Sequence, residues 1–335
     1  MNTIAQVAGL VLLSMAATAL YAPFLIKLLY RLHIVVRHKL MPDKSNEEFM
    51  KTQVGKSGTP TLGGLMISIS VFVLTFFIVP FSPLKTLFLA FWFVFTMYGL
   101  IEGLYVYGRK LSVKLRQLEG SFGFRLFKLA VLFSICLLVV AVTTSTLAIS
   151  TLTLFGLVIP VTPLAIIIGS GCFVFAVYAM EITDGADGLV TGQFIIAMVS
   201  YILISVLTGH AEVLSMLALM LGASIVYLYF NINPARVFMG GTGTFPIAFA
   251  LLFFSIITNT VDIFFIMGMV FWVEVSTSFL QIFWIRFLHK RLFKIAPIHH
   301  YFQAIGWEET KMVQRFWLAS AVFAIISLFV FGLIK

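Results

Sequence analysis

The sequence predicts an all-α integral membrane protein of about ten transmembrane helices, and three observations lead to that prediction. First, 61% of the 335 residues are apolar and only 10% are charged, whereas soluble domains carry about 25% charged residues. Second, apolar stretches long enough to cross a bilayer as a helix recur along the whole chain. Third, no alternating strand pattern accompanies them, which argues against a β-barrel. We interpret residues 1–335 as a single membrane domain.

Ten segments are long enough and apolar enough to span a bilayer. They comprise residues 4–30, 61–81, 85–107, 124–145, 149–179, 189–208, 211–230, 245–259, 261–285 and 316–334. The fifth segment is too long for one straight span, so we expect Pro160 and Pro163 to break it. The eighth segment is short, and the sequence does not mark its ends.

The first segment is interpreted as a retained helix with a periplasmic N-terminus, because its basic residues follow the apolar stretch instead of preceding it. Ten spans from that start place five loops in the cytoplasm: residues 31–60, 108–123, 180–188, 231–244 and 286–315. Of the 22 Lys and Arg residues, 20 lie in or beside these loops, and only Lys85 and Lys335 lie on the other side. This asymmetry follows the positive-inside rule, so the net charge of +9 indicates topology and is poor evidence for nucleic-acid binding.

The cytoplasmic loop TDGADGLVTG, residues 183–192, carries two closely spaced carboxylates. Asp184 and Asp187 are three residues apart, so in a helical turn both side chains point the same way. Two carboxylates at that spacing suit Mg²⁺. A turn in which an aspartate caps the next helix is the alternative, and the pattern alone does not decide between the two.

A glycine-rich turn, KSGTPTLGG at residues 56–64, precedes the second segment. Its backbone N–H groups and Lys56 are suited to surrounding a phosphate. The stretch lacks the spacing of a P-loop. A plain loop that leads into a helix, with Pro60 near the first turn, is the alternative.

Two adjacent histidines, His299 and His300, lie in the basic loop before the last segment. No Cys or third His is near, so binding of a phosphate or a substrate hydroxyl is favoured over a metal site, with a plain polar loop as the alternative. Glu274 lies inside the ninth segment, where a carboxylate must be paired. We expect an Arg or Lys of the cytoplasmic side as its partner, in preference to a direct role on substrate.

Four stretches together resemble the polyprenyl-phosphate N-acetylhexosamine-1-phosphate transferase superfamily and, within it, the phospho-N-acetylmuramoyl-pentapeptide transferase family. They are KSGTPTLGG, TDGADGL, FNINPARVFMGGTG and RLFKIAPIHHYFQAIGWEETKMVQRFW. The resemblance covers nearly the whole chain and implies a ten-helix enzyme of the bacterial inner membrane, which requires Mg²⁺ and often forms a homodimer. It implies transfer of phospho-MurNAc-pentapeptide from UDP-MurNAc-pentapeptide to undecaprenyl phosphate, with release of UMP.

The resemblance also implies roles for individual residues. It makes Glu102, Asp184 and Asp187 catalytic, with Asp184 and Asp187 as Mg²⁺ ligands. The substrate-binding residues that it implies are Lys56, Thr61, Glu181, Asn231, Phe238, His299 and His300. Among them, Phe238 would stack under the uracil ring. Mg²⁺ and Lys56 would neutralise the charge of the pyrophosphate.

The sequence departs from the family pattern mainly at acidic positions. The family's paired aspartates correspond to Glu102 and Gly103, and the metal-binding aspartate of its VFMGD motif corresponds to Gly241. Further substitutions replace a lysine, two asparagines and a third histidine, by Val106, Tyr178, Glu181 and Tyr301 respectively. We hypothesise that Glu181 takes the place of a lost metal ligand.

Two other functions are alternatives to the enzyme. A relative without catalytic activity could bind UDP-sugar or polyprenyl phosphate, or act as a scaffold for cell-wall enzymes. The altered acidic positions motivate this alternative, because the loss of a metal carboxylate commonly lowers rates by orders of magnitude. A transporter is disfavoured, because the polar loops gather at one membrane face and no inverted repeat is present.

Overall fold

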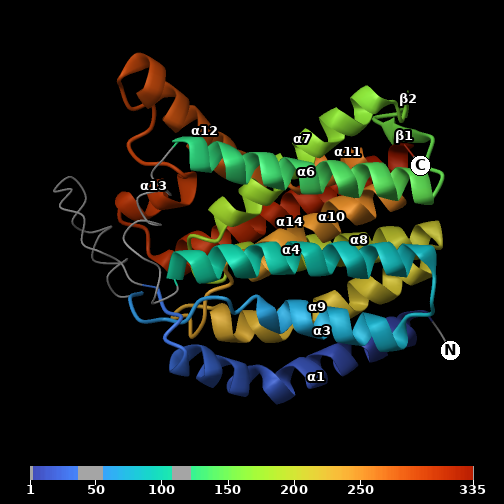
Figure 1. Ribbon diagram of the computed structural model, residues 1–335, viewed down its shortest axis with the longest axis horizontal. Coiled ribbons are helices and arrows are strands. Elements are labelled where there is room, and N and C mark those ends of the chain that lie inside the picture. Colours follow the sequence, from blue (N-terminus) through green and yellow to red (C-terminus); the bar gives the residue numbers. More distant parts are fainter. Residues whose placement is uncertain (1–2, 37–55, 108–121, 335) are drawn as a thin grey trace.

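The computed structural model describes residues 3–36, 56–107 and 122–334, and these are almost entirely helical (Figure 1). The helices are α1 (Thr3–Arg31), α3 (Leu65–Ile78), α4 (Pro83–Tyr107), α6 (Phe122–Thr146), α7 (Pro163–Thr183), α8 (Leu189–Thr208), α9 (Ala211–Asn231), α10 (Gly241–Ile257), α11 (Val261–Met267), α12 (Met269–Leu288), α13 (Ile298–Ala304) and α14 (Glu309–Ile334). Two strands, β1 (Thr151–Leu154) and β2 (Leu157–Pro160), form an antiparallel hairpin. Much of two predicted cytoplasmic loops, residues 37–55 and 108–121, lies outside the described residues.

Each of the ten predicted segments contains helix. Among the described residues, seven helices are long and apolar enough to cross a bilayer, and α11 with α12 makes an eighth span that is bent by 71°. The shorter apolar helices α3 and α10 have 14 and 17 residues. Helix α1 begins and α14 ends at the same end of the bundle, as an even number of crossings requires (Figure 1). The prediction of an all-α, multi-pass membrane protein is confirmed.

The predicted fifth span, residues 149–179, is wrong in its first part. Residues 151–160 form the β-hairpin, with Thr151 opposite Pro160, and α7 begins only at Pro163. The expected break at the prolines is therefore present, but a strand pair precedes it. Thr162 accepts a hydrogen bond from Ala165 N at 3.2 Å and caps α7, and a proline is well tolerated in the first turn that follows.

Helix α10 lies at the centre of the bundle, packed against α4 and α7. Its residues 242–256 are all buried. Aromatic side chains fill the space between these helices: the Phe249 ring lies 5.3 Å from that of Phe95 and 5.9 Å from that of Phe88. Because neighbouring helices surround α10, it needs no polar face, and this explains why a short segment is apolar throughout.

Glycines bring α4, the turn before α3 and the start of α10 into backbone contact. A Cβ atom on Gly99 would lie 2.1 Å from the carbonyl oxygen of Gly241, and one on Gly64 would lie 2.2 Å from the amide nitrogen of Gly243. Real Cβ atoms do not approach so closely, so a side chain at either position would force the segments apart. This packing fixes one wall of the polar end of the molecule.

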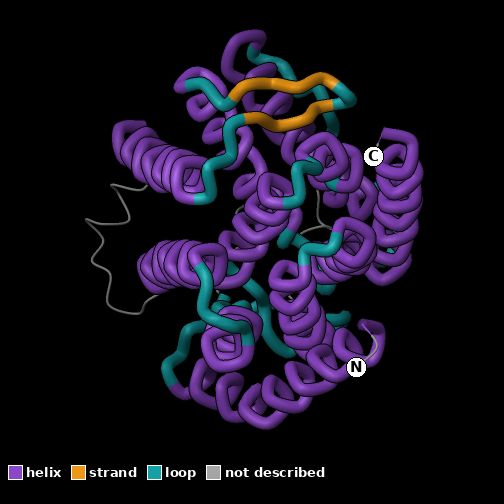
Figure 2. Tube along the Cα trace, turned by 90° about the vertical axis from the view of Figure 1, so that its right-hand side faces the viewer, coloured by secondary structure: helices purple, strands orange, loops and turns teal. Residues whose placement is uncertain are grey.

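The two ends of the bundle differ. One end carries α13 and the loops with the polar motifs, and the other carries the β-hairpin and both chain ends (Figure 1). Figure 2 shows the hairpin end, where the two strands lie across the helix ends. The polar motifs therefore gather at one face of the bundle, as the sequence predicts.

Candidate active site

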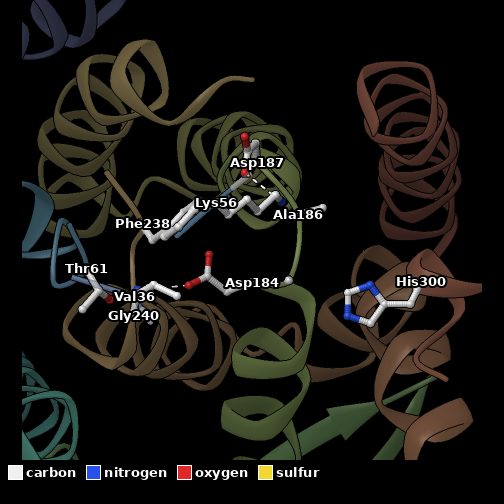
Figure 3. A pocket seen from close by; sticks show the side chains of 10 residues that line it. Val36, Lys56, Thr61, Asp184, Ala186, Asp187, Phe238, Gly240 and His300 are labelled. Atoms are coloured by element: carbon white, nitrogen blue, oxygen red, sulfur yellow. Dashed lines mark hydrogen bonds and ion pairs between the residues drawn. The ribbon is translucent and has the colours of Figure 1, made fainter. Parts of the chain in front are cut away.

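The loops at the polar end surround a cavity of about 190 Å³. Its lining comes from five separate parts of the chain: Val36, Lys56, Thr61, Asp184, Gly185, Ala186, Asp187, Phe238, Gly240 and His300. Figure 3 shows Lys56, Phe238 and the two aspartates close together, with His300 on the far side of the view from Thr61. Six of the predicted site residues line this cavity. Glu102, Glu181, Asn231 and His299 do not.

The Asp187 side chain is held by two other segments of the chain. Its Oδ2 accepts hydrogen bonds from Asn233 Nδ2 and Ala235 N, both at 3.0 Å, and its Oδ1 lies 2.9 Å from Lys56 Nζ. The N-cap residue of α8 is Gly188, so neither aspartate side chain caps the start of that helix. The φ of Gly188 is 77°, a conformation that glycine adopts readily. The helix-cap alternative for this loop is therefore wrong.

Lys56 is shared between two carboxylates. Its Nζ lies 2.9 Å from Asp187 Oδ1 and 2.5 Å from Oε1 of Glu309, in the first turn of α14. It also lies 5.9 Å from the centre of the Phe238 ring, within cation–π range. Burial by itself lowers the pKa of Lys56, but the carboxylates of Glu309 and Asp187 outweigh it and raise the pKa above its ordinary value. Lys56 is therefore a fixed positive charge at neutral pH.

Asp184 ends α7 and faces the VFMGG loop. Its Oδ2 accepts a hydrogen bond from Gly240 N at 3.0 Å. Burial raises the pKa of Asp184 to about 7; the Gly240 hydrogen bond and Lys56 oppose that shift, and Asp187 adds to it. Gly240 has a φ of 61°, and a Cβ atom there would lie 3.0 Å from Thr61 Oγ1. Glycine at 240 therefore allows the loop to reach the carboxylate.

Phe238 is clamped by the glycine-rich turn. Its N donates to Pro60 O at 2.8 Å, and its O accepts from Gly63 N at 2.8 Å. Helix α3 begins at Leu65, so Pro60 lies in the clamp and not in a first helical turn. The turn does lead into a helix, but the expected position of Pro60 near the first helical turn is wrong. The turn also orients Phe238 beside Lys56 (Figure 3).

Asn231 lies beneath the acidic loop. Its Oδ1 accepts from Gly188 N at 3.1 Å and from Thr191 Oγ1 at 3.2 Å, and its Nδ2 donates to Val237 O at 3.0 Å. Every polar atom of this buried amide is thus used within the protein. The arrangement ties the acidic loop to the segment that carries Phe238, so Asn231 shapes the cavity from behind.

His299 and Glu274 form a buried pair. His299 Nδ1 lies 2.8 Å from Glu274 Oε2, and both side chains are fully buried. The expectation that Glu274 pairs with Arg or Lys is wrong, because α13 places a histidine against it. Burial, with Lys56 nearby, lowers the pKa of His299 to about 3, so its ring is neutral. A Cβ atom at position 185 would lie only 2.4 Å from His299 Nε2. This close approach explains why residue 185 is a glycine.

Burial also lowers the pKa of His300 to about 3, and His299 adds to that shift. The Nδ1 of His300 lies 3.0 Å from Gln303 Oε1. Unlike His299, the His300 ring lines the cavity. The two adjacent histidines therefore have different positions: His299 packs against the acidic loop at Gly185, and His300 lines the cavity.

Glu102 and Glu181 belong to a separate polar group at the ends of α4, α6 and α7. Lys128 of α6 forms an ion pair with Glu102. Glu181 is close enough to Glu102, Lys128 and Asp184 for an electrostatic interaction with each. Glu102 is thus neutralised by a lysine of the chain itself, and the hypothesis that Glu181 replaces a metal ligand stays a prediction.

The positions of the two missing aspartates are closely packed. A Cβ atom on Gly103 would lie 2.2 Å from the side chain of Leu62, which is buried at that point. A Cβ atom on Gly241 would lie 3.0 Å from the Cα of Gly99 and 3.2 Å from the Phe245 ring. Leu62 at one position, and the backbone of α4 with the Phe245 ring at the other, therefore crowd the first atom of any side chain placed there.

The donor set restricts how a metal ion could be held. Among the described residues, no group of three or more His, Cys, Asp or Glu side chains is arranged to hold one. Both oxygens of Asp187 are already contacted, whereas the Gly240 hydrogen bond uses only one oxygen of Asp184. Mg²⁺ often takes one or two carboxylates and completes its shell with substrate phosphates and water. The residues fit an ion completed by substrate oxygens, with Asp184 as a protein ligand, and do not fit a closed protein-only site.

Two residues of the site were missed from the sequence. Glu309 and Asn233 contact Lys56 and Asp187. Both lie in stretches that carry the family resemblance, but nothing in those stretches singles out either residue as part of the site. An acidic residue in the first turn of a helix is common, since it interacts favourably with the helix dipole. Only the packing of α14 against α8 brings Glu309 next to the acidic loop.

Comparisons with known proteins show the family to which the chain belongs. Glycosyl transferase family 4 matches residues 121–259. The phospho-N-acetylmuramoyl-pentapeptide-transferase of Clostridioides difficile (strain 630) is 33% identical over 280 residues, 83% of this chain and 85% of the relative. That of Staphylococcus carnosus (strain TM300) is 30% identical over 85% of this chain and 88% of the relative. That of Staphylococcus aureus (strain MSSA476) is 30% identical over 95% and 97%. The chain therefore belongs to the phospho-N-acetylmuramoyl-pentapeptide transferase family and is a multi-pass phosphoglycosyltransferase of the bacterial inner membrane.

Proposed function

We propose that this protein transfers phospho-MurNAc-pentapeptide from UDP-MurNAc-pentapeptide to undecaprenyl phosphate, giving lipid I and UMP. In this reaction an oxygen of the lipid phosphate forms a bond to the sugar-bearing phosphorus. The bond from that phosphorus to the UMP oxygen breaks, and UMP leaves with the electron pair. The relatives' names support the choice of sugar and peptide, and the geometry of the cavity supports a nucleotide site there.

The observation that carries the proposal is the placement of Lys56 beside Phe238 in a cavity at one end of a membrane bundle. A lysine ammonium is a strong phosphate binder, and a clamped aromatic ring offers a flat face for a nucleobase. The two lie 5.9 Å apart, from ammonium to ring centre. A uridine ring on Phe238 would therefore bring its phosphates toward Lys56.

The remaining residues would act by position. His300 faces the same cavity and is neutral at physiological pH, so it can accept or donate a hydrogen bond to a sugar or phosphate oxygen without adding charge. Asn231, His299 and Glu274 keep the acidic loop and the Phe238 segment in place. Such fixed positioning is the main contribution that a protein makes to phosphoryl transfer.

We propose Mg²⁺ as the cofactor, with Asp184 supplying one oxygen and the diphosphate and water supplying the others. The ion would neutralise charge on the phosphates. Asp184 is chosen because it has an oxygen that the Gly240 hydrogen bond does not use, whereas Asp187 already forms an ion pair with Lys56. Removing divalent cations with EDTA is expected to lower UMP release by at least about a hundredfold, and added Mg²⁺ or Mn²⁺ to restore it.

The test uses purified protein with Mg²⁺, UDP-MurNAc-pentapeptide and undecaprenyl phosphate, and measures UMP and lipid product together. Stoichiometric formation of both supports the proposal. A protein that binds UMP but releases none from the donor would contradict it and would favour a relative that binds without turnover. A donor with GlcNAc in place of the MurNAc-pentapeptide tests the sugar assignment, because the proposal expects no transfer from it.

A further inference from the structure

Glu309 and Asp187 hold the same lysine, but they are anchored differently. Asp187 Oδ2 accepts hydrogen bonds from one backbone donor, Ala235 N, and one side-chain donor, Asn233 Nδ2, and neither bond depends on Lys56. Glu309 Oε1 keeps a hydrogen bond from Asp187 N at 2.7 Å. Lys56 could therefore move away from Glu309 without leaving Oε1 of Glu309 unpaired. Oδ1 of Asp187 differs, because among the described residues it has no hydrogen-bond partner and depends on its ion pair with Lys56. The lysine is the member of this trio that is free to change partners.

The charges of the trio oppose an incoming phosphate. One ammonium faces two carboxylates, so the three groups together carry a net charge of −1. All three side chains are largely buried, with exposed fractions of 12% for Lys56, 11% for Glu309 and 3% for Asp187, so solvent screens these charges incompletely. A phosphate that binds Lys56 must compete with both carboxylates. Glu309 lies closest to the ammonium, at 2.5 Å.

We infer that Glu309 competes with the ligand's phosphate for Lys56 and thereby keeps the affinity for UMP low. This inference rests on the proposed function, in which UMP is the leaving product. When a phosphate occupies the cavity, the Lys56 ammonium moves from Glu309 toward it. When UMP leaves, Glu309 takes the ammonium back. The carboxylate is thus a positioning residue whose effect is on ligand exchange, and it need not touch the reacting atoms.

The experiment compares the binding of UMP and uridine to the purified full-length protein by calorimetry. Glu309→Gln removes the charge, while the amide oxygen can still accept the hydrogen bond from Asp187 N. We expect UMP to bind about fivefold to tenfold more tightly to this variant, as befits one partly buried charge pair, and uridine to bind unchanged. In turnover, UMP should become a correspondingly stronger product inhibitor.

Glu308→Gln is the matched control. Glu308 is the neighbouring residue, it is exposed, and its substitution removes the same net charge from the chain. It should leave the affinity for UMP unchanged. Glu309→Asp provides a second variant should the glutamine variant fold poorly: it keeps the charge but withdraws it by one methylene, so UMP affinity should rise by a smaller factor.

The outcomes separate this inference from the proposed function. If UMP binds Glu309→Gln no more tightly than wild type, or more weakly, Glu309 does not compete and the inference is wrong, while the proposed function stands. If UMP and uridine affinities rise together, the effect does not involve the phosphate, and the inference is again wrong. If wild type and both Glu309 variants bind no UMP, the nucleotide site itself is refuted and both fail together.

Discussion

The polar end of the molecule has two sides that differ in how charge is handled. On one side, Lys56, Asp187 and Glu309 form an open network at the wall of a cavity. On the other side, Lys128 pairs with Glu102, and glycines at 103 and 241 are packed against neighbouring chain. The first side keeps charged groups that a ligand can engage. On the second side Glu102 is paired with Lys128 and two acidic positions of the family are glycine, so we expect the groups that engage a ligand to lie on the cavity side.

The sharpest test of this difference compares the two lysines. Lys56→Met should lower UMP release by about a hundredfold to a thousandfold, because it removes a charge aimed at the phosphates. Lys128→Met should lower it by less than about tenfold, since its partner Glu102 lies outside the cavity. Initial rates under saturating donor give the comparison. Equal losses in the two variants would show that the Glu102 side takes part in the reaction.

The packed side can be broken by a single methyl group. Gly99→Ala places a Cβ atom against the backbone of Gly241, so α4 and α10 must separate, at an expected cost of about 2–4 kcal/mol. Gly171→Ala on α7 is the control, because nothing lies within 4 Å of its Cβ position. Thermal unfolding in detergent should show a lower Tm for Gly99→Ala only. A normal Tm for that variant would mean that the glycine contact is dispensable.

Position 103, where the family has an aspartate and this chain has a glycine, offers a further test of the packed side. Gly103→Asp alone should destabilise the protein, because its Cβ atom meets Leu62. Adding Leu62→Ala should recover part of that loss, with a coupling of about 1–2 kcal/mol between the two sites. Direct binding of Mn²⁺, followed by electron paramagnetic resonance, would then report whether the double variant gains a metal ligand. Purely additive Tm changes would show that Leu62 does not occupy the carboxylate's space.

The smallest expected effect concerns the pH dependence of stability. Burial holds the pKa of His299 near 3, well below the ordinary value of 6.5, so unfolding at mildly acidic pH takes up a proton. Its contribution to stability is complete above about pH 6.5 and is lost as the pH falls toward 3. His299→Gln should therefore make Tm less sensitive to pH between about 6.5 and 4. A slope identical to wild type would place the acid sensitivity elsewhere, with His300 as the next residue to test.

The sequence was sufficient to predict the bundle, because bilayer-length apolar segments and the Lys and Arg asymmetry are strong physical signals. The hairpin at residues 151–160 was not predicted. Its two short strands, TLTL and LVIP, continue the apolar stretch that was assigned to the fifth span. The lining residues Lys56, Asp184, Asp187 and Phe238 were found because they stand in compact motifs.

Glu309 and the partnership of Glu274 with His299 could not be found in that way. Each depends on contacts between residues that are far apart in the chain: 253 positions separate Lys56 from Glu309, and 25 separate Glu274 from His299. The consequence of the glycine at 241 was also hidden. Its departure from the family pattern is visible in the sequence, but the contact with Gly99 that accompanies it is a property of the fold.

The shortness of α3 and α10 has a consequence for how a lipid meets this site. With 14 and 17 residues, they are about 21 and 25 Å long, whereas the hydrocarbon layer is about 30 Å thick. Both helices begin directly beneath the cavity, at the glycine-rich turn and at Gly241. If their far ends reach the outer boundary of the bilayer, the floor of the cavity lies several ångströms below the level of the headgroups. A phosphate bound at that floor would then lie at a depth that a membrane-embedded chain can reach without its tail leaving the bilayer.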